Sequence, residues 1–498
     1  MSDSSAHLKQ PEAQALSASL TDNLRMIQTV WKSSADLIVT KFSAGSIGCA
    51  MLSCEGMVSS SLLSQMVFQP INSIEEQFSD ADALFSHLKT KLLLSTDCQT
   101  VRNFAEISRM LSAGFAVFFA DGTASALAVG VQGYASRSIA EPESEQNIYG
   151  AKEGFTENIR TNLSLLRRRM KSPLLTMQMC TAGSVSRTDL CICYLQDRVD
   201  MDFVAEIQKK LENLPLETVL SSGYVRPFLE EHGSRLFHSV GTTERPDVLC
   251  AKMLEGRIAV LIDGTPFALV LPQLFWELFQ TMDDYNVPPA YATMIRLLKL
   301  AALAAALLLP AFYLAIAVWH PELLNRTLLQ ILSEAEQRAP FSLAVEMLGV
   351  LFMFEVIREA GIRLPKAVGG AVSIVGGLII GDAAVNSGLV STPVLTVTAL
   401  AVTAGFVIPE LHSVMSLLRP LLILAASVCG LSGIAVVSAA ILLDLCAAEV
   451  CGFPVTAPFA PLRCSRLRDV FVRIGFKSLS QGNFHVSEVR NARRTDKF

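Results

Sequence analysis

The long apolar runs that follow residue 296 constrain this chain more than any other feature. The first run, at 297–319, exceeds the roughly 20 apolar residues that a helix needs to cross the hydrocarbon core of a membrane. Further runs continue to residue 447, whereas residues 1–295 are an ordinary soluble mixture of strand and helix patterns. We therefore predict an α/β cytoplasmic N-terminal region followed by an all-α polytopic membrane domain.

Four segments follow the first run and complete the predicted membrane domain. Segment 341–366 has embedded charges, 367–389 is rich in glycine, and 392–408 is apolar without charged residues. Within the second of these, Gly377 and Gly381 form a GxxxG pair, which favours close packing of helices. The last segment, 417–447, is too long for one untilted helix.

The parity of the crossings predicts a break in 417–447. The tail at 461–498 has nine Lys and Arg against three Asp and Glu, so the positive-inside rule places it in the cytoplasm. With both chain ends inside, the number of crossings is even, and we expect two short helices or a re-entrant hairpin that breaks near Gly430. A single tilted helix fits only if an earlier, weaker segment does not cross.

The N-terminus has neither the basic nor the apolar stretch of a signal peptide, so the soluble region is predicted to stay in the cytoplasm. The predicted parts are a disordered N-terminus at 1–20, α/β subdomains at 21–140 and 141–290, a membrane domain of four to six helices at 291–460, and a basic cytoplasmic tail at 461–498.

Two stretches of the soluble region resemble each other and indicate two related subdomains. Residues 117–129 and 260–270 share an apolar strand, Asp-Gly-Thr and a second strand. Asp-Gly between apolar runs predicts a hairpin, since Gly accepts a positive φ. Residues 50–63 are a looser relative. Strand 188–197 and a helix at 201–214 with Asp200 as N-cap complete the pattern.

Composition excludes several classes of protein. A net charge of −5 argues against nucleic-acid binding. No CxxC pair accompanies the 11 cysteines, and Cys191 and Cys193 share one face of a strand, so we expect free thiols, no disulfide and no metal site. No P-loop, dinucleotide fingerprint, HExxH or GxSxG motif occurs in the sequence. We therefore expect that the protein is not an enzyme and binds no cofactor.

Charged side chains inside the predicted membrane domain are the candidate pore or gate residues, because such charges are costly in a bilayer. Glu346 and Glu355 are nine residues apart and face opposite sides of one helix. Asp382 and Asn386 form a polar stripe on the glycine-rich segment. The alternative is that these groups form interhelical pairs that only orient helices.

Glu355, Arg358 and Glu359 have the spacing of a local intramembrane ion pair near the inner interface. A basic run, Arg167-Arg168-Arg169 with Lys171, ends a predicted helix in the soluble region. It is open to two interpretations, contact with anionic lipid head groups or a solvated helix C-terminus that favours cations.

Several stretches of the chain together form a specific pattern: TERPD and LEGRIAVLIDGTPFALVLP, REAGIRLP, EPESEQNIYGAKEGFTENIRTNL, AVGGAVSIVGGLIIGDAAV, PELLN and APFAPLR. With these stretches the chain resembles the A-subunit family of spore germinant receptors (GerA type). The resemblance covers about 20–475. The less similar relative is the stage V sporulation AF-type paralogue.

This resemblance implies a multi-pass protein of the spore inner membrane with both ends in the cytoplasm. It implies a homo-oligomer in the lipid bilayer that works with germinant receptor B and C subunits, or with another small membrane partner. Such subunits are expected to form or gate an ion channel that releases monovalent cations. The paralogue would amplify ion release, and a non-conducting scaffold is the third hypothesis.

The resemblance also suggests a role for the charged turn at Glu244, Arg245, Pro246 and Asp247. This turn, with the Asp263-Gly264 hairpin, is expected to couple the cytoplasmic domain to the membrane helices or to a neighbouring subunit. The alternative is a local salt-bridged loop with no coupling role.

Overall fold

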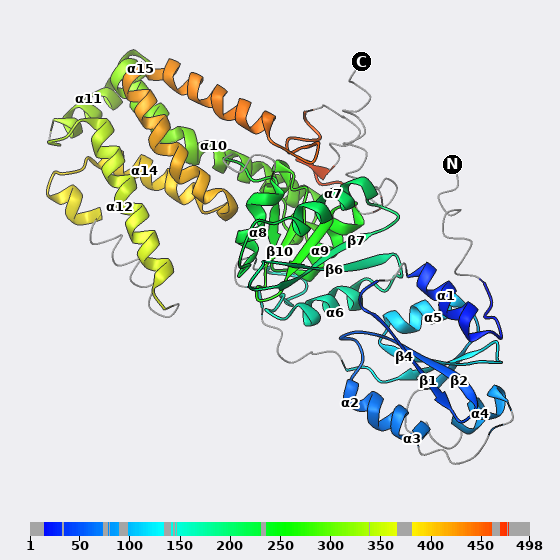
Figure 1. Ribbon diagram of the computed structural model, residues 1–498. Coiled ribbons are helices and arrows are strands. Elements are labelled where there is room, and N and C mark those ends of the chain that lie inside the picture. Colours follow the sequence, from blue (N-terminus) through cyan, green and yellow to red (C-terminus); the bar gives the residue numbers. More distant parts are fainter. Residues whose placement is uncertain are drawn as a thin grey trace.

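Two α/β units and one helical module follow each other along the chain (Figure 1). The computed structural model describes residues 14–475 and 477, apart from 32–33, 73–77, 79, 89–97, 134–140, 143–144, 146, 231–235, 338, 366–380 and 461–468. The first unit lies at one end of the molecule, the second in the middle and the helical module at the other end (Figure 1). An N-terminal α/β region followed by a helical region is thus confirmed.

The first repeat is a five-stranded antiparallel sheet in the order β1-β2-β4-β5-β3. Its elements are α1 (Leu20–Val30), β1 (Leu37–Ala44), β2 (Ile47–Cys54), α2 (Ser60–Leu63), a π-helical turn (Ser64–Phe68), α3 (Gln69–Asn72), α4 (Ala81–His87), β3 (Cys98–Val101), α5 (Phe104–Ser112), β4 (Phe115–Ala120) and β5 (Ala126–Gly130).

The second repeat has the same topology, with the strand order β6-β7-β9-β10-β8. Its elements are α6 (Ile159–Arg169), β6 (Leu175–Ala182), β7 (Thr188–Leu195), α7 (Met201–Glu212), α8 (Ser222–Leu229), β8 (Gly241–Thr243), α9 (Pro246–Leu254), β9 (Ile258–Ile262) and β10 (Ala268–Leu271). The two predicted Asp-Gly hairpins are β4–β5 and β9–β10, at equivalent places. Residues 50–63 are no third copy, because β2 ends there and the chain enters α2.

The Asp-Gly turns of the two repeats make equivalent hydrogen bonds. Asp121 Oδ1 accepts the N–H of Leu20, the first residue of α1, at 2.9 Å. Asp263 Oδ1 accepts the N–H of Ile159, the first residue of α6, at 3.0 Å. The first N–H groups of a helix have no partner within the helix. Each turn therefore fastens its hairpin to the helix that precedes the sheet.

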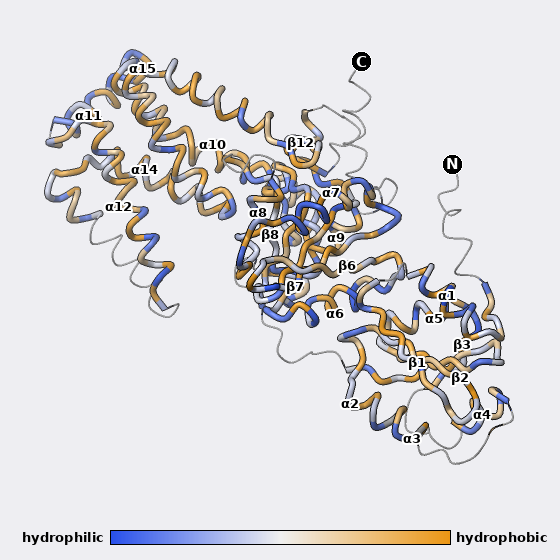
Figure 2. Tube along the Cα trace, viewed as in Figure 1, coloured by the Kyte–Doolittle hydropathy of each residue, from blue (hydrophilic) through white to orange (hydrophobic). Residues whose placement is uncertain are grey.

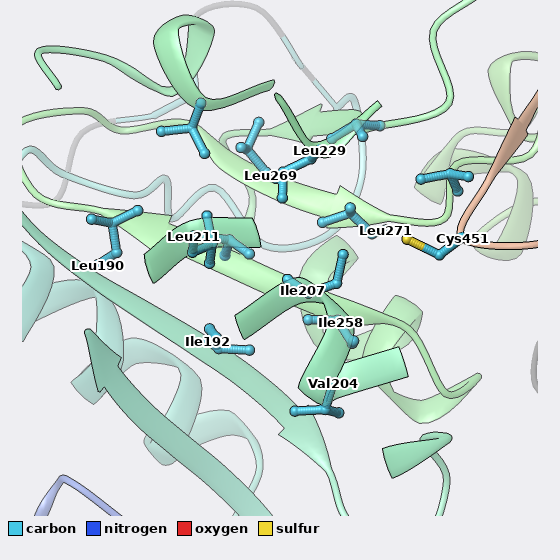
Figure 3. Packing of buried hydrophobic residues seen from close by; sticks show 14 of the residues in the cluster. Leu190, Ile192, Val204, Ile207, Leu211, Leu229, Ile258, Leu269, Leu271 and Cys451 are labelled. Carbon is cyan, nitrogen blue, oxygen red and sulfur yellow. The ribbon is translucent and has the colours of Figure 1, made fainter. Parts of the chain in front are cut away.

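Apolar side chains fill both faces of each sheet. Figure 3 shows one face of the second sheet, where side chains of β7, β9 and β10 pack against α7 and α8. On the opposite face Cys191 and Cys193 are fully buried, with their sulfur atoms 3.7 Å apart. The cysteines of the described residues are free thiols, as predicted.

The helical region contains α10 (Pro289–Trp319), α11 (Arg326–Glu336), α12 (Leu343–Arg363), α14 (Thr392–Gly405) and α15 (His412–Ala447). Among the described residues, two stretches are long and apolar enough to span a membrane, Pro289–Trp319 and Pro409–Ala447. Apolar residues dominate the trace of this module (Figure 2). Gly377 lies outside the described residues, so its predicted packing role stays a prediction.

The predicted break in 417–447 is confirmed at Gly430, whose φ of 60° and ψ of −139° interrupt α15. A Cβ atom there would lie 2.9 Å from the Trp319 side chain, so the site needs glycine for space as well as for backbone conformation. The first half of α15 runs beside α10 to the tip of the module, and the second half runs back toward the second repeat (Figure 1).

After α15 the chain returns to the core of the second repeat. A short hairpin of β11 (Glu449–Val450) and β12 (Phe453–Pro454) buries Val450, Cys451 and Phe453 there. The Phe453 ring lies 4.9 Å from that of Phe203 in α7. The predicted all-α domain at 291–460 is therefore wrong at its C-terminal end, because these apolar residues complete a soluble core.

One further boundary needs correction. Residues 14–20 of the predicted disordered N-terminus lie on the first sheet, since Leu16 is buried and its N–H binds the Arg102 carbonyl at 3.0 Å. Residues 1–13 lie outside the described residues. Within the predicted basic tail, Asp469 and Arg473 contact the start of the helical module.

Candidate functional site

Arg245 holds a loop against the second repeat. It precedes α9, and Pro246 suits the first helical position because its missing N–H would have no partner there. The Arg245 side chain is 2% exposed and pairs with Asp247 at 2.7 Å. It also donates to the carbonyls of Ala151 at 3.0 Å and Glu145 at 3.3 Å. The turn thus contains a local ion pair, and its arginine also binds the loop at 145–151, about 100 residues earlier in the chain.

The Glu145 carboxylate belongs to the same cluster. It accepts hydrogen bonds from the Thr243 hydroxyl at 2.8 Å and from the Glu244 N–H at 3.3 Å. Burial raises the pKa of Glu145 to about 7, against the lowering effect of these two donors.

The loop at 145–151 connects this cluster to the helical module. The N–H groups of Ile148 and Tyr149 donate to the Asp283 carboxylate at 3.1 and 3.0 Å. Asp283 lies in a 3-10 turn, Met282–Tyr285, directly before α10. The charged turn of Arg245 therefore reaches α10 through this loop and this 3-10 turn.

The residue after Asp283 binds α10 itself. Asp284 pairs with Arg296 at 2.7 Å, and both are almost fully buried. Arg296 also pairs with Asp469 of the C-terminal segment at 2.9 Å, and the Tyr285 hydroxyl donates to the same carboxylate at 2.7 Å. Burial and the Asp469 charge raise the pKa of Tyr285, which keeps its hydroxyl protonated. We call Asp283, Asp284, Tyr285, Arg296 and Asp469 the junction cluster.

A second ionic group fastens the chain just before the junction cluster. Glu277 lies in a 3-10 turn, Phe275–Phe279, and pairs with Lys252 of α9 and with Arg257. Arg257 is 1% exposed and also donates to the Pro272 carbonyl at 3.1 Å. This turn is thereby held against the second sheet, next to the start of α10.

Asp263 and Gly264 lie elsewhere in the molecule. Their turn is at the opposite end of β10 from the segment that leads to α10. Asp263 binds α6, and the Gly264 N–H donates to the Glu157 carbonyl at 2.8 Å. This part of the predicted coupling motif therefore holds the second repeat together and is not at the junction.

The basic run at 167–171 joins the two repeats. Arg167 is 1% exposed, pairs with Asp36 at 2.7 Å and lies over the Trp31 ring at 4.9 Å. Arg168 and Arg169 both pair with Glu153. Arg167 neither faces lipid head groups nor ends the helix in solvent, so both interpretations made from the sequence are wrong for it. Its charge is paired with the buried Asp36 carboxylate of the first repeat.

Glu355 links two helices of the module. It pairs with Arg358 at 2.8 Å, accepts a hydrogen bond from the Ser416 hydroxyl and lies 3.5 Å from His412 Nε2 in α15. Glu359 pairs instead with Arg363 at 2.7 Å. The predicted triplet therefore divides into an interhelical group and an exposed pair.

Glu346 is 3% exposed, and its Oε1 atom accepts the Ser391 N–H. Asp382 and Asn386 are exposed, and among the described residues no hydrogen bond or ion pair joins them to Glu346 or Glu355. The candidate pore residues therefore do not form one cluster within a single chain.

Arg419 was missed by sequence reasoning. It is 2% exposed and donates to the carbonyls of Ala306 at 2.7 Å and Ala401 at 3.2 Å. Pro310 has no N–H, so it leaves the Ala306 carbonyl without its helical donor. A Cβ atom at Gly405 would lie 2.3 Å from Arg419, so glycine makes room for the guanidinium. The available signal was an arginine inside the apolar run 417–447.

No group of three His, Cys, Asp or Glu within the described part of the chain has the arrangement of a metal site. Helices α10, α12, α14 and α15 pack through a shared apolar cluster, to which the polar contacts of Glu346, Glu355 and Arg419 are added.

Comparison with known proteins gives consistent matches. A family model described as "Bacillus/Clostridium GerA spore germination protein" matches residues 25–483. Spore germination protein KA of Bacillus subtilis (strain 168) is 33% identical over 92% of this chain and 85% of its own length. The uncharacterized membrane protein YfkQ of the same organism is 33% identical over 94% of this chain and 91% of its own.

One solved structure is also similar. It is the N-terminal domain of the A subunit of the Bacillus megaterium spore germinant receptor GerK3, at 29% identity. The match covers 53% of this chain and 98% of that one, with a TM-score of 0.42.

Proposed function

The chain belongs to the Bacillus/Clostridium GerA spore germination protein family, and on that premise we propose that it is a membrane subunit of the germination machinery that forms or gates an oligomeric channel for monovalent cations. Its place is the spore inner membrane, with the α/β repeats in the cytoplasm. Its partners are further copies of itself and the receptor B and C subunits or another small membrane protein. It is not an enzyme.

The path of the chain supports a polytopic arrangement. The helical module starts at α10 and ends with a hairpin inside the second repeat, so both of its ends lie on one side. We therefore propose an even number of crossings, of which α10, α12, α14 and the two halves of α15 supply five. The sixth is the glycine-rich segment predicted from the sequence, most of which lies outside the described residues. Gly430 supports this count because it divides α15 at its tip.

The junction cluster is the observation that carries the proposal. Arg296 binds Asp284 on its soluble side and Asp469 on the returning segment, and it lies in α10 itself. A displacement of the loop at 145–151 therefore reaches the first helix of the module and the C-terminal segment that carries Asp469 at one point. A ligand or a neighbouring subunit shifts the module between two conformations only if it binds one of these conformations more tightly than the other.

Potassium release from purified spores after nutrient addition tests this function. The strains are the native strain, a deletion, Asp284→Asn, and the double variant Glu346→Ala with Asp382→Ala. Glu334→Gln, on the exposed face of α11, is the control, and immunoblots verify that each variant accumulates. We expect the deletion to abolish release, Asp284→Asn to slow it and the control to match the native strain.

The same experiment separates the alternatives. A deletion that only slows release identifies the amplifying stage V sporulation AF-type role. A deletion that blocks release, combined with normal release in Asp284→Asn and in Glu346→Ala with Asp382→Ala, identifies a non-conducting scaffold. Native release in the deletion strain contradicts the proposed function altogether.

A further inference from the structure

Besides Nη2 of Arg296 and Oδ2 of Asp444, three buried polar atoms among the described residues of the helical module have no hydrogen-bond partner. They are the hydroxyl oxygen of Tyr313 in α10, Oε2 of Glu346 in α12 and the hydroxyl oxygen of Ser391 at the start of α14. The side chains of Glu346 and Ser391 are more than nine-tenths buried. Buried polar atoms without partners are uncommon in folded proteins, and three from one helical module call for a common explanation.

The fold brings the three residues to the same end of the module. Tyr313 lies in the last two turns of α10, Glu346 in the first turn of α12 and Ser391 at the N-cap of α14. The residues next to them, Leu314, Met347 and Val390, pack in one apolar cluster, which Tyr313 also contacts. Tyr313 is within electrostatic range of Glu346. This end is far from the soluble repeats, because α10 runs away from them (Figure 1).

The charge of Glu346 is only partly compensated. Its Oε1 atom accepts the first N–H of α14, whose N-terminal end favours a negative charge. No ion pair to Glu346 is present among the described residues. A buried carboxylate is costly unless it is neutralised or paired, so Oε2 needs either a proton or another cation.

The neighbouring hydroxyls indicate what that partner is. Hydroxyl oxygens carry two acceptor lone pairs, and neither Tyr313 nor Ser391 donates its proton to Oε2. Three oxygens with one negative charge suit a cation that prefers oxygen ligands. Ca²⁺ usually takes six to eight oxygens, several of them from carboxylates, and one buried carboxylate does not supply them.

We propose that Glu346 Oε2, with the Ser391 and Tyr313 hydroxyl oxygens, binds one monovalent alkali cation, Na⁺ or K⁺, at the far end of the helical module. The position of this site on a path for cations rests on the proposed function. Binding itself does not require conduction, because all three ligands come from one chain.

Binding of ²²Na⁺ and ⁸⁶Rb⁺ to the purified full-length protein in lipid nanodiscs tests the site. We expect one ion per chain for one of the two isotopes. The thermal midpoint should rise by roughly 2–4 °C when that ion replaces N-methyl-D-glucamine at constant ionic strength, at about ten times its dissociation constant.

Four variants locate the site. Glu346→Gln should abolish binding and the cation-dependent shift. Tyr313→Phe and Ser391→Ala keep the carboxylate and should weaken binding by about tenfold, the loss typical of one contact to a charge. Glu334→Gln, an exposed carboxylate on α11, should bind like the native protein.

Absence of a bound ion in the native protein overturns the proposal, as does a site that prefers Ca²⁺ or Mg²⁺. Unchanged binding in Glu346→Gln, or in both hydroxyl variants, also overturns it. Failure of the proposed function is distinguishable, because it leaves ion binding intact while deletion spores release potassium normally.

Discussion

The two α/β repeats differ at the residue that precedes their equivalent helices α5 and α9. In the first repeat Asn103 caps α5, with its side chain accepting the Glu106 N–H at 2.8 Å. In the second repeat Arg245 occupies this position and makes no such cap. Its guanidinium instead holds the loop at 145–151.

A second difference lies in α1 and α6, the helices that precede the sheets. Counted from the equivalent Asn23 and Asn162, Gln28 and Arg167 occupy the same position. Gln28 is exposed, whereas Arg167 is buried against Asp36. At these two positions the first repeat has a helix-capping asparagine and an exposed glutamine. The second repeat has two arginines that bind distant segments.

The largest expected effect is on the contact between the repeats. Arg167→Ala leaves Asp36 buried without its partner, which typically costs about 3–5 kcal/mol. Denaturant unfolding of the full-length protein, followed by the fluorescence of the neighbouring Trp31, measures this cost. Gln28→Ala is the matched control and should lie within about 0.5 kcal/mol of the native protein. Equal effects would remove the distinction between the two helices.

Making the second repeat like the first should release the loop. Arg245→Asn supplies a cap for α9 but removes the contacts to Ala151 and Glu145, with a net loss of about 2–3 kcal/mol. Hydrogen exchange at the Ile148 and Tyr149 amides should become faster, while exchange in α9 itself should not. Unchanged exchange in the loop would show that Asp283 alone holds it.

The pH dependence distinguishes the repeats as well. Because the pKa of Glu145 is about 7 in the folded protein, its contribution to stability is complete below the ordinary value near 4.5 and is lost as the pH rises to 7 and above. We expect stability to fall by about 2 kcal/mol between pH 5 and pH 8. Thermal unfolding of Glu145→Gln should lack this slope, and an equal slope in the variant would assign it to another group.

The smallest effect should be equal in the two repeats. Asp121→Ala and Asp263→Ala each remove one acceptor from the start of a helix, which costs about 1 kcal/mol. Unfolding free energies that agree within about 0.5 kcal/mol would support the structural duplication. A clear difference would mean that one turn has acquired a further role.

The sequence allowed the prediction of features that depend on local pattern. Alternating apolar residues around Asp-Gly indicated both central hairpins, and run length with crossing parity indicated the break at Gly430. Asp200 also caps α7 as expected. These signals are short in range, because a turn or a helix end is determined by a few neighbouring residues.

The junction cluster was not predictable in the same way. Asp283, Arg296 and Asp469 carry charges that suggest solvent exposure. Arg296 pairs with Asp469 across 173 positions of the chain, and Asp283 accepts from Ile148 across 135. The hairpin at 449–454 was hidden for another reason. Its strands have two residues each and directly follow an apolar helix, so no period can be read from them.

The return of the chain at 449–454 has a consequence for biosynthesis. Phe453 completes a core whose other members come from residues 182–271, yet the ribosome makes the whole helical module between these parts. The second repeat therefore receives its last core residues only after every helix of the module has been translated. A chain truncated within α15 lacks them, so the closing of this core reports that insertion of the module has reached its end.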